Sequence, residues 1–75
     1  MPKLPLISAS EAIAAFEKLN YQIVRQKGSH IRARHKTNKN KKPLTIPNHK
    51  ALGKGLLRKL LRDAEITVDD FLKLL

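Results

Sequence analysis

The sequence predicts a small α+β fold with the order α-β-β-β-α and a short helical segment at the C-terminus. Near both ends of the chain, apolar residues recur at three- and four-residue steps, which is typical of amphipathic helices. Between them lie three short segments rich in β-forming residues, and their spacing predicts a three-stranded antiparallel sheet made of two hairpins. We expect residues 1–75 to form a single domain, because a chain of this length has material for only one thin core.

The first helix is predicted to begin at the capping-box sequence Ser8-Ala9-Ser10-Glu11. In such a box the serine hydroxyl accepts a hydrogen bond from the N3 amide, and the N3 glutamate accepts one from the serine amide. The apolar face of this helix consists of Ala9, Ala12, Ile13, Phe16 and Leu19. Asn20 tolerates the left-handed backbone conformation that ends many helices, so we expect the helix to end there.

The next two elements are predicted strands joined by a tight turn. Residues 21–27 are rich in β-forming side chains, and Gly28-Ser29 is the turn that follows them. The second strand covers residues 30–36, and its successive side chains point to opposite faces of the sheet. One face is therefore cationic and carries a histidine, with the residues His30, Arg32, Arg34 and Lys36. The other face carries Ile31, Ala33 and His35.

A basic hairpin loop over residues 37–42 leads to a short third strand, residues 44–46, which Pro47 ends. Helical spacing returns from Leu52 to Ala64, with leucines on one half of the helix. The other half carries Lys54, Arg58, Lys59 and Arg62. Gly53 and Gly55 are poor helix formers, so we expect the helix to begin near them. The sequence Thr67-Val68-Asp69-Asp70 predicts the cap of a last helical segment.

The charges are segregated along the chain. The formal net charge is +10, and no Asp or Glu lies between residues 18 and 62. That window holds every basic residue except Lys3 and Lys73. Because solvated surfaces usually mix both signs, the segregation predicts a polyanionic partner. Nucleic acid is the first expectation, an acidic protein the second and an anionic membrane surface the third.

Several classes of protein are disfavoured. The chain has no Cys, so it has no disulfide and no thiolate metal site, and no acid lies near any histidine. The longest apolar run, Ala12 to Phe16, is far below the roughly 20 residues of a membrane span. The first residues lack the apolar region of a secretion signal, so the expected location is the cytoplasm. No nucleotide-binding fingerprint is present, and we expect neither a metal nor another cofactor.

His30 is the candidate for chemistry. Cleavage of RNA without a metal requires that the ribose 2′-hydroxyl lose a proton and that the leaving 5′-oxygen gain one. A histidine titrates near neutral pH and can move either proton, while Arg and Lys stabilise the charge on the phosphate. Gly28 permits close approach of the backbone, and Ser29 can hold a phosphate oxygen. The alternative is a surface histidine that only contacts phosphate.

The other two histidines have different expectations. His49 follows Pro47-Asn48, and it is either a second acid/base, a phosphate contact or, as we favour, a residue of the loop or helix cap. His35 is separated from His30 by an odd number of residues, so we expect it on the opposite face of the strand, packed or exposed to solvent. The predicted RNA-binding residues around His30 are Lys27, Gly28, Ser29, Arg32, Arg34, Lys36, His49, Lys50, Lys54 and Arg58.

Three stretches, residues 25–30, 45–50 and 56–75, together resemble the HicA family of toxins, which are small mRNA interferases paired with a HicB antitoxin. The resemblance covers the chain from about Ser8 onward. It implies the fold of a double-stranded RNA-binding domain, with two helices packed on one face of the sheet. It also implies cleavage of mRNA independently of the ribosome, with the histidine of Gly-Ser-His, here His30, as the catalytic residue. The implied partner is a HicB-like antitoxin, which we expect to cover the basic face with an acidic surface.

The sequence departs from this family pattern at two positions. Many relatives have threonine where this chain has Leu56, and glycine where it has Glu65. A non-glycine residue in a left-handed cap costs about 1 kcal/mol. The alternative hypotheses are a non-catalytic module that binds double-stranded RNA and, with less support, a DNA-binding accessory protein.

Overall fold

The computed structural model describes residues 3–75, so residues 1 and 2 of the predicted domain lie outside it. The elements are α1 (Ala9–Glu17), β1 (Tyr21–Lys27), β2 (His30–His35), β3 (Leu44–Pro47), α2 (Lys54–Ala64) and α3 (Val68–Leu72). The predicted α+β class and the predicted order of elements are confirmed. The differences are small: β2 ends at His35 rather than at residue 36, α1 ends at Glu17 rather than at Asn20, and β3 includes Pro47.

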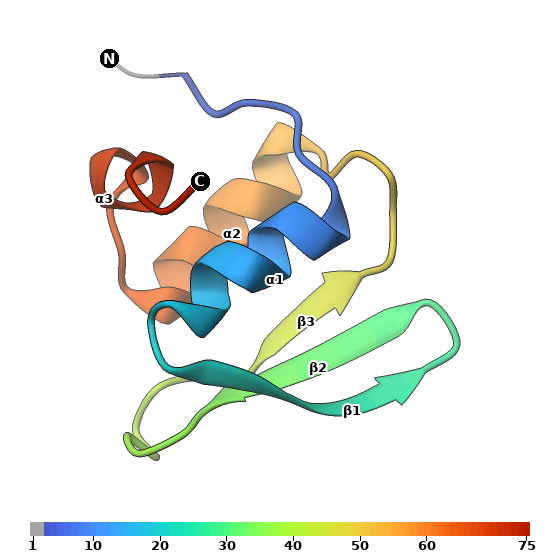
Figure 1. Ribbon diagram of the computed structural model, residues 1–75, viewed down its shortest axis with the longest axis vertical. Helices are drawn as coiled ribbons and strands as arrows, with labels where there is room; N and C mark the ends of the chain where they lie inside the picture. Colours follow the sequence, from blue (N-terminus) through green and yellow to red (C-terminus); the bar gives the residue numbers. More distant parts are fainter. Residues whose placement is uncertain (1–2) are drawn as a thin grey trace.

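The three strands form one antiparallel sheet in the order β1-β2-β3. Figure 1 shows α1 and α2 side by side over one face of this sheet, while the other face stays open. The covered face carries the buried side chains of Ile31 and Ala33 from β2 and of Leu44 and Ile46 from β3. The molecule therefore has two layers, and everything on the outer face of the sheet is available to a partner.

The ends of the helices follow the predicted chemistry. The hydroxyl of Ser8 accepts from the amide of Glu11 (3.1 Å), and the carboxylate of Glu11 accepts from the amide of Ser8 (3.1 Å), which completes the capping box. Asn20 adopts the left-handed conformation with φ 70°. The hydroxyl of Thr67 accepts from the amide of Asp70 (3.1 Å) at the start of α3. Local sequence patterns thus fix where these helices begin and where the chain turns.

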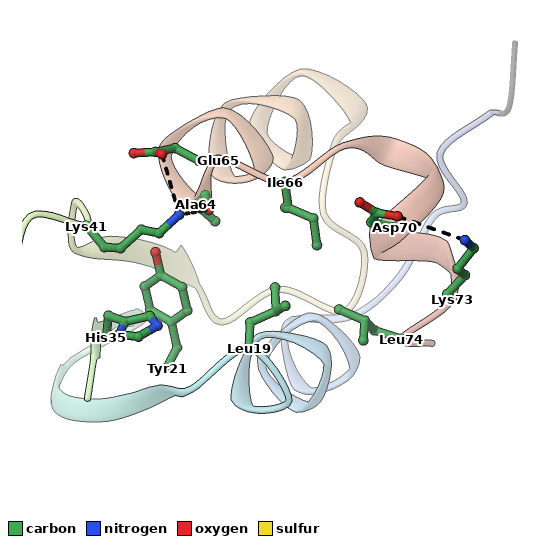
Figure 2. A pocket seen from close by; sticks show the side chains of 10 residues that line it. All are labelled: Leu19, Tyr21, His35, Lys41, Ala64, Glu65, Ile66, Asp70, Lys73 and Leu74. Carbon is green, nitrogen blue, oxygen red and sulfur yellow. Dashed lines mark hydrogen bonds and ion pairs between the residues drawn. The ribbon is translucent and has the colours of Figure 1, made fainter. Parts of the chain in front are cut away.

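The end of α2 has no glycine, and a lysine from a distant loop binds there. Glu65 has φ 58° and ψ 45°, and the amide of Ile66 donates back to the carbonyl of Leu61 (3.0 Å). The ammonium of Lys41, from the β2–β3 loop, donates to the carbonyl of Ala64 (3.1 Å) and lies 3.5 Å from the carboxylate of Glu65, as Figure 2 shows. A cation at a helix C-terminus is favourable, so Lys41 offsets part of the cost of the left-handed cap.

Both ends of the chain add to the core. Leu4 and Ile7 are buried, and the amide of Leu52 donates to the carbonyl of Ile7 (2.7 Å). At the other end, the ring of Phe71 packs 5.4 Å from the ring of Phe16. None of the helices within residues 3–75 combines the length and the apolar character that a membrane crossing requires.

Candidate nucleic-acid interface

His30 stands at the start of β2, directly after the Gly28-Ser29 turn. Lys27 and His30 are the last cross-strand pair of the β1–β2 hairpin, so the turn between them has only two residues. Gly28 has φ 58°, a conformation that other residues adopt only at a cost. A Cβ atom built on Gly28 meets nothing within 4 Å, so the turn itself requires the glycine. The turn holds His30 at the rim of the open face.

A β-bulge at Val24 brings two more cations to this face. The register passes from the pair Ile23–Ala33 to the pair Arg25–Arg32, which leaves one extra residue in β1. Because residues directly opposite each other point to the same face, Arg25 joins Arg32. Lys27 joins His30 on the open face for the same reason.

The predicted set omitted Arg25, which the bulge places on the open face. Simple alternation counted from Tyr21 places Arg25 on the same face as Tyr21 and Ile23, which is the face that the helices cover. The sequence did contain a signal of the bulge, because simple alternation assigns the basic residue Arg25 to the apolar face of the strand. A bulge resolves such a conflict by shifting the alternation by one residue.

The open face has a shallow cavity around His30, which we call the His30 cavity. Its volume is about 160 Å³, and its lining residues are Arg25, Lys27, His30, Arg32 and Thr45. All five side chains are exposed, and none of them is acidic. A cavity lined by three basic side chains and one imidazole is suited to bind a phosphate and to place a proton-transfer group beside it.

The structure shows no metal-binding constellation within residues 3–75, since no three His, Cys, Asp or Glu side chains come together there. His35 lies on the helix-covered side of the sheet, as the alternation predicts. Its ring packs 5.3 Å from that of Tyr21, and its Nδ1 accepts from the amides of Asn38 (2.9 Å) and Thr37 (3.3 Å). This histidine therefore organises the start of the β2–β3 loop.

His49 and Lys50 are exposed in the loop between β3 and α2 and do not line the His30 cavity. The amide of Asn48 donates to the carbonyl of Ser29 (2.6 Å), which ties this loop to the Gly28-Ser29 turn. The carbonyl of His49 accepts from the amide of Ala9 (3.0 Å) at the start of α1. The loop is thus held between the sheet and the helix layer at the same end of the molecule as His30.

The remaining predicted contacts fall into two groups. Arg34 and Lys36 continue the row of cations along the open face beyond Arg32. Lys54 and Arg58 are exposed on α2, which packs on the opposite face of the sheet (Figure 1). The structure therefore separates these two helix residues from the His30 cavity.

A larger cavity lies at the far end of the β1–β2 ladder from His30. It has a volume of about 410 Å³, and Figure 2 shows Leu19, Ile66 and Leu74 around it. The hydroxyl of Tyr21 is buried at its side and has no hydrogen-bond partner among the described residues. Burial, and after it the carboxylates of Glu65 and Asp63, raise the pKa of Tyr21 above its ordinary value. This cavity is mostly apolar, and it does not share the charge of the His30 cavity.

A family model described as the HicA toxin of bacterial toxin–antitoxin matches residues 9–66. The chain belongs to the HicA toxin family. Membership makes it the toxin of a toxin–antitoxin pair and implies a cognate antitoxin. No curated protein matches the sequence.

The match to the HicA family runs from the start of α1 to just beyond α2, so it includes the Gly28-Ser29 turn and the His30 cavity. At the first departure from the family pattern, Leu56 is half-buried and packs against the core. The N-cap of α2 is Gly53, which offers no side-chain hydrogen bond. At the second departure, Glu65 adopts the left-handed conformation that a glycine would accept at lower cost.

Proposed function

We propose that this HicA-family toxin is a metal-independent endoribonuclease that cleaves mRNA, with His30 as a general acid/base. The observation that carries the proposal is the His30 cavity, in which one exposed imidazole lies among Arg25, Lys27 and Arg32. Cytoplasmic mRNA is a polyanion, and its phosphates are attracted to a face that carries basic residues and no acidic ones.

The reaction follows from the groups present. A base removes the proton of the ribose 2′-hydroxyl, and the 2′-oxygen attacks the adjacent phosphorus. The bond between phosphorus and the 5′-oxygen breaks, and the 5′-oxygen receives a proton. The products are a 2′,3′-cyclic phosphate and a free 5′-hydroxyl. His30 carries one of the two proton transfers, and His49, another group or water carries the second.

The three cations stabilise the charge that develops on the phosphorane. They lie on rigid neighbouring strands, because Arg25 pairs with Arg32 and Lys27 with His30. Removing one such preorganised charge or donor typically lowers kcat by about 10²–10³-fold. We therefore expect Arg25→Ala and Arg32→Ala to lower kcat without unfolding the protein, since both side chains are exposed.

The decisive experiment incubates labelled RNA with the protein in EDTA. The wild type is expected to yield fragments, and His30→Ala is expected to yield none while its circular dichroism spectrum stays unchanged. Lys59→Ala is the control, because Lys59 is also exposed but lies on α2, outside the cavity. Cleavage by His30→Ala at the wild-type rate would contradict the assignment of His30.

The cognate antitoxin is proposed to be HicB-like and to cover the His30 face with an acidic surface. Such a complex hides the positive charge and excludes RNA by occupying the same face. The test is cleavage of RNA across a titration with the antitoxin, together with modification of His30 by diethyl pyrocarbonate. Full modification of His30 in the inhibited complex would argue against occlusion.

The second candidate function is a module that binds double-stranded RNA without cutting it. It is favoured by one observation, that Lys54 and Arg58 are both exposed on α2, in the helix layer and outside the His30 cavity. This function predicts no fragments in EDTA. It also predicts that Lys54→Ala combined with Arg58→Ala abolishes binding of duplex RNA, whereas His30→Ala weakens it only slightly.

A further inference from the structure

The open face of β2 carries a row of positive side chains that begins at His30. Arg32 and Arg34 follow on the same face, and Lys36 continues the row just after the strand ends. Successive members are two residues apart, which is about 6.6 Å along a strand. We call Arg32, Arg34 and Lys36 the β2 track.

Two cavities lie along this row. Arg32 belongs to the His30 cavity, and Arg34 and Lys36 line a second cavity of about 280 Å³, which also includes Lys39. Among residues 3–75, the ion pairs are Lys41 with Glu65 and Lys73 with Asp70, so none involves a residue of the β2 track. No carboxylate therefore competes with a ligand for the β2 track.

The track extends to one side of His30 only. In the other direction the chain turns at Gly28-Ser29, and His30 itself is the first residue of the ladder with β3. Beyond that point the loop with His49 rises from the sheet to α1, as the hydrogen bond between His49 and Ala9 shows. Along β2, a ligand phosphate at His30 thus finds its further cations toward Lys36.

The shape of the surface favours a single strand over a duplex. A duplex is held by contacts spread over successive grooves, whereas the track is one line of cations along one β-strand. The open face of β3 offers uncharged Thr45 and Pro47. The aromatic rings of Phe16, Tyr21 and Phe71 are buried, so none of these three rings stacks on a base.

We propose that single-stranded RNA lies along the β2 track, with the scissile phosphate at His30 and the following phosphates on Arg34 and Lys36. This inference rests on the proposed nuclease function. It assigns the substrate as a flexible, unpaired segment that is bound through its backbone. The bound segment extends for several nucleotides on one side of the cleaved bond and is short on the other side.

The test measures kcat/KM on single-stranded oligonucleotides that carry zero to four extra nucleotides on either the 5′ or the 3′ side of one cleavable bond. We expect kcat/KM to rise with extension on one side only. Arg34→Ala combined with Lys36→Ala should lower kcat/KM by a factor that grows as that side lengthens. Lys59→Ala combined with Arg62→Ala removes the same charge from the exposed side of α2 and is the control.

Salt dependence gives a second measure. Each phosphate contact on a single strand contributes about 0.7 to the slope of log affinity against log salt, so loss of two contacts lowers the slope by about 1.4. Between 50 and 200 mM salt, the affinity gap between wild type and the Arg34/Lys36 double variant should therefore shrink about sevenfold.

Three results would overturn the inference. The first is equal gain from extension on both sides, and the second is an unchanged slope in the double variant. The third is a double variant that binds RNA normally but has lost its antitoxin, which would make the track a protein interface. If even the wild type cuts no RNA, the proposed nuclease function fails, and fluorescence anisotropy with the same oligonucleotides still tests the track.

Discussion

The bulge at Val24 can be tested by two deletions that leave strands of equal length. Deletion of Val24 makes the ladder regular and keeps Arg25 opposite Arg32, so Arg25 remains in the His30 cavity. Deletion of Gln26 also makes the ladder regular, but Val24 then stands opposite Arg32 and Arg25 moves to the other face. Lys27 stays opposite His30 in both variants.

The structure sets the expected magnitudes. Val24 is 45% exposed and Gln26 is also exposed, so either deletion removes little buried surface. Both variants are therefore expected to fold. Only the deletion of Gln26 removes one of the three cations from the His30 cavity, which predicts a loss in kcat of about 10²–10³-fold relative to the deletion of Val24.

The assay is cleavage of labelled RNA in EDTA, with thermal unfolding to verify that both deletion variants are folded. Arg25→Ala in the full-length chain provides the reference, and its rate should match that of the Gln26 deletion. Equal rates for the two folded deletion variants would refute the reasoning, since the face on which Arg25 lies would then be irrelevant.

Three further predictions concern stability. Tyr21→Phe should raise the free energy of unfolding in urea by about 1 kcal/mol, because the hydroxyl is buried without a partner. The raised pKa of Tyr21 means that the folded state holds this proton more tightly, so wild-type stability should fall above about pH 10 more steeply than that of Tyr21→Phe. His35→Ala should lower the free energy of unfolding by about 1–3 kcal/mol, because the amides of Thr37 and Asn38 lose their acceptor. The control His49→Ala should lower it by less than about 0.5 kcal/mol, because the His49 side chain is exposed. Glu65→Gly should raise the free energy of unfolding, measured by thermal unfolding, by up to about 1 kcal/mol. The substitution also removes the exposed ion pair between Glu65 and Lys41, which reduces this gain.

The elements of the fold could be predicted because each has a local pattern. The capping box at Ser8, the turn at Gly28-Ser29 and the alternation along β2 depend on residues within a few positions of one another. The same alternation placed His30 and His35 on opposite faces, which the structure confirms. Sequence periodicity predicts the face on which a residue lies where a single helix or strand continues without interruption.

The features that escaped prediction depend on contacts between distant segments. Lys41 binds the end of α2 across 23 residues, and Ile7 pairs with Leu52 from the far side of the core. The bulge at Val24 interrupts the alternation in β1 and places Arg25 on the open face, although the predicted site did not include it. Local patterns contain no information on which layer α2 occupies, and the separation of Arg58 from the His30 cavity required the three-dimensional arrangement.

The charge on the open face opposes the folding of the sheet. Arg25 stands directly opposite Arg32, although like charges at such positions destabilise a sheet. An open face needs no apolar residues, so folding alone would be served better by mixed charges there. Repulsion within a row of like charges lowers the stability of the folded state. A bound polyanion neutralises these charges and so removes the repulsion. RNA or an acidic antitoxin on this face should therefore stabilise the toxin by more than a neutral ligand of equal size, because either one also relieves the repulsion between Arg25 and Arg32.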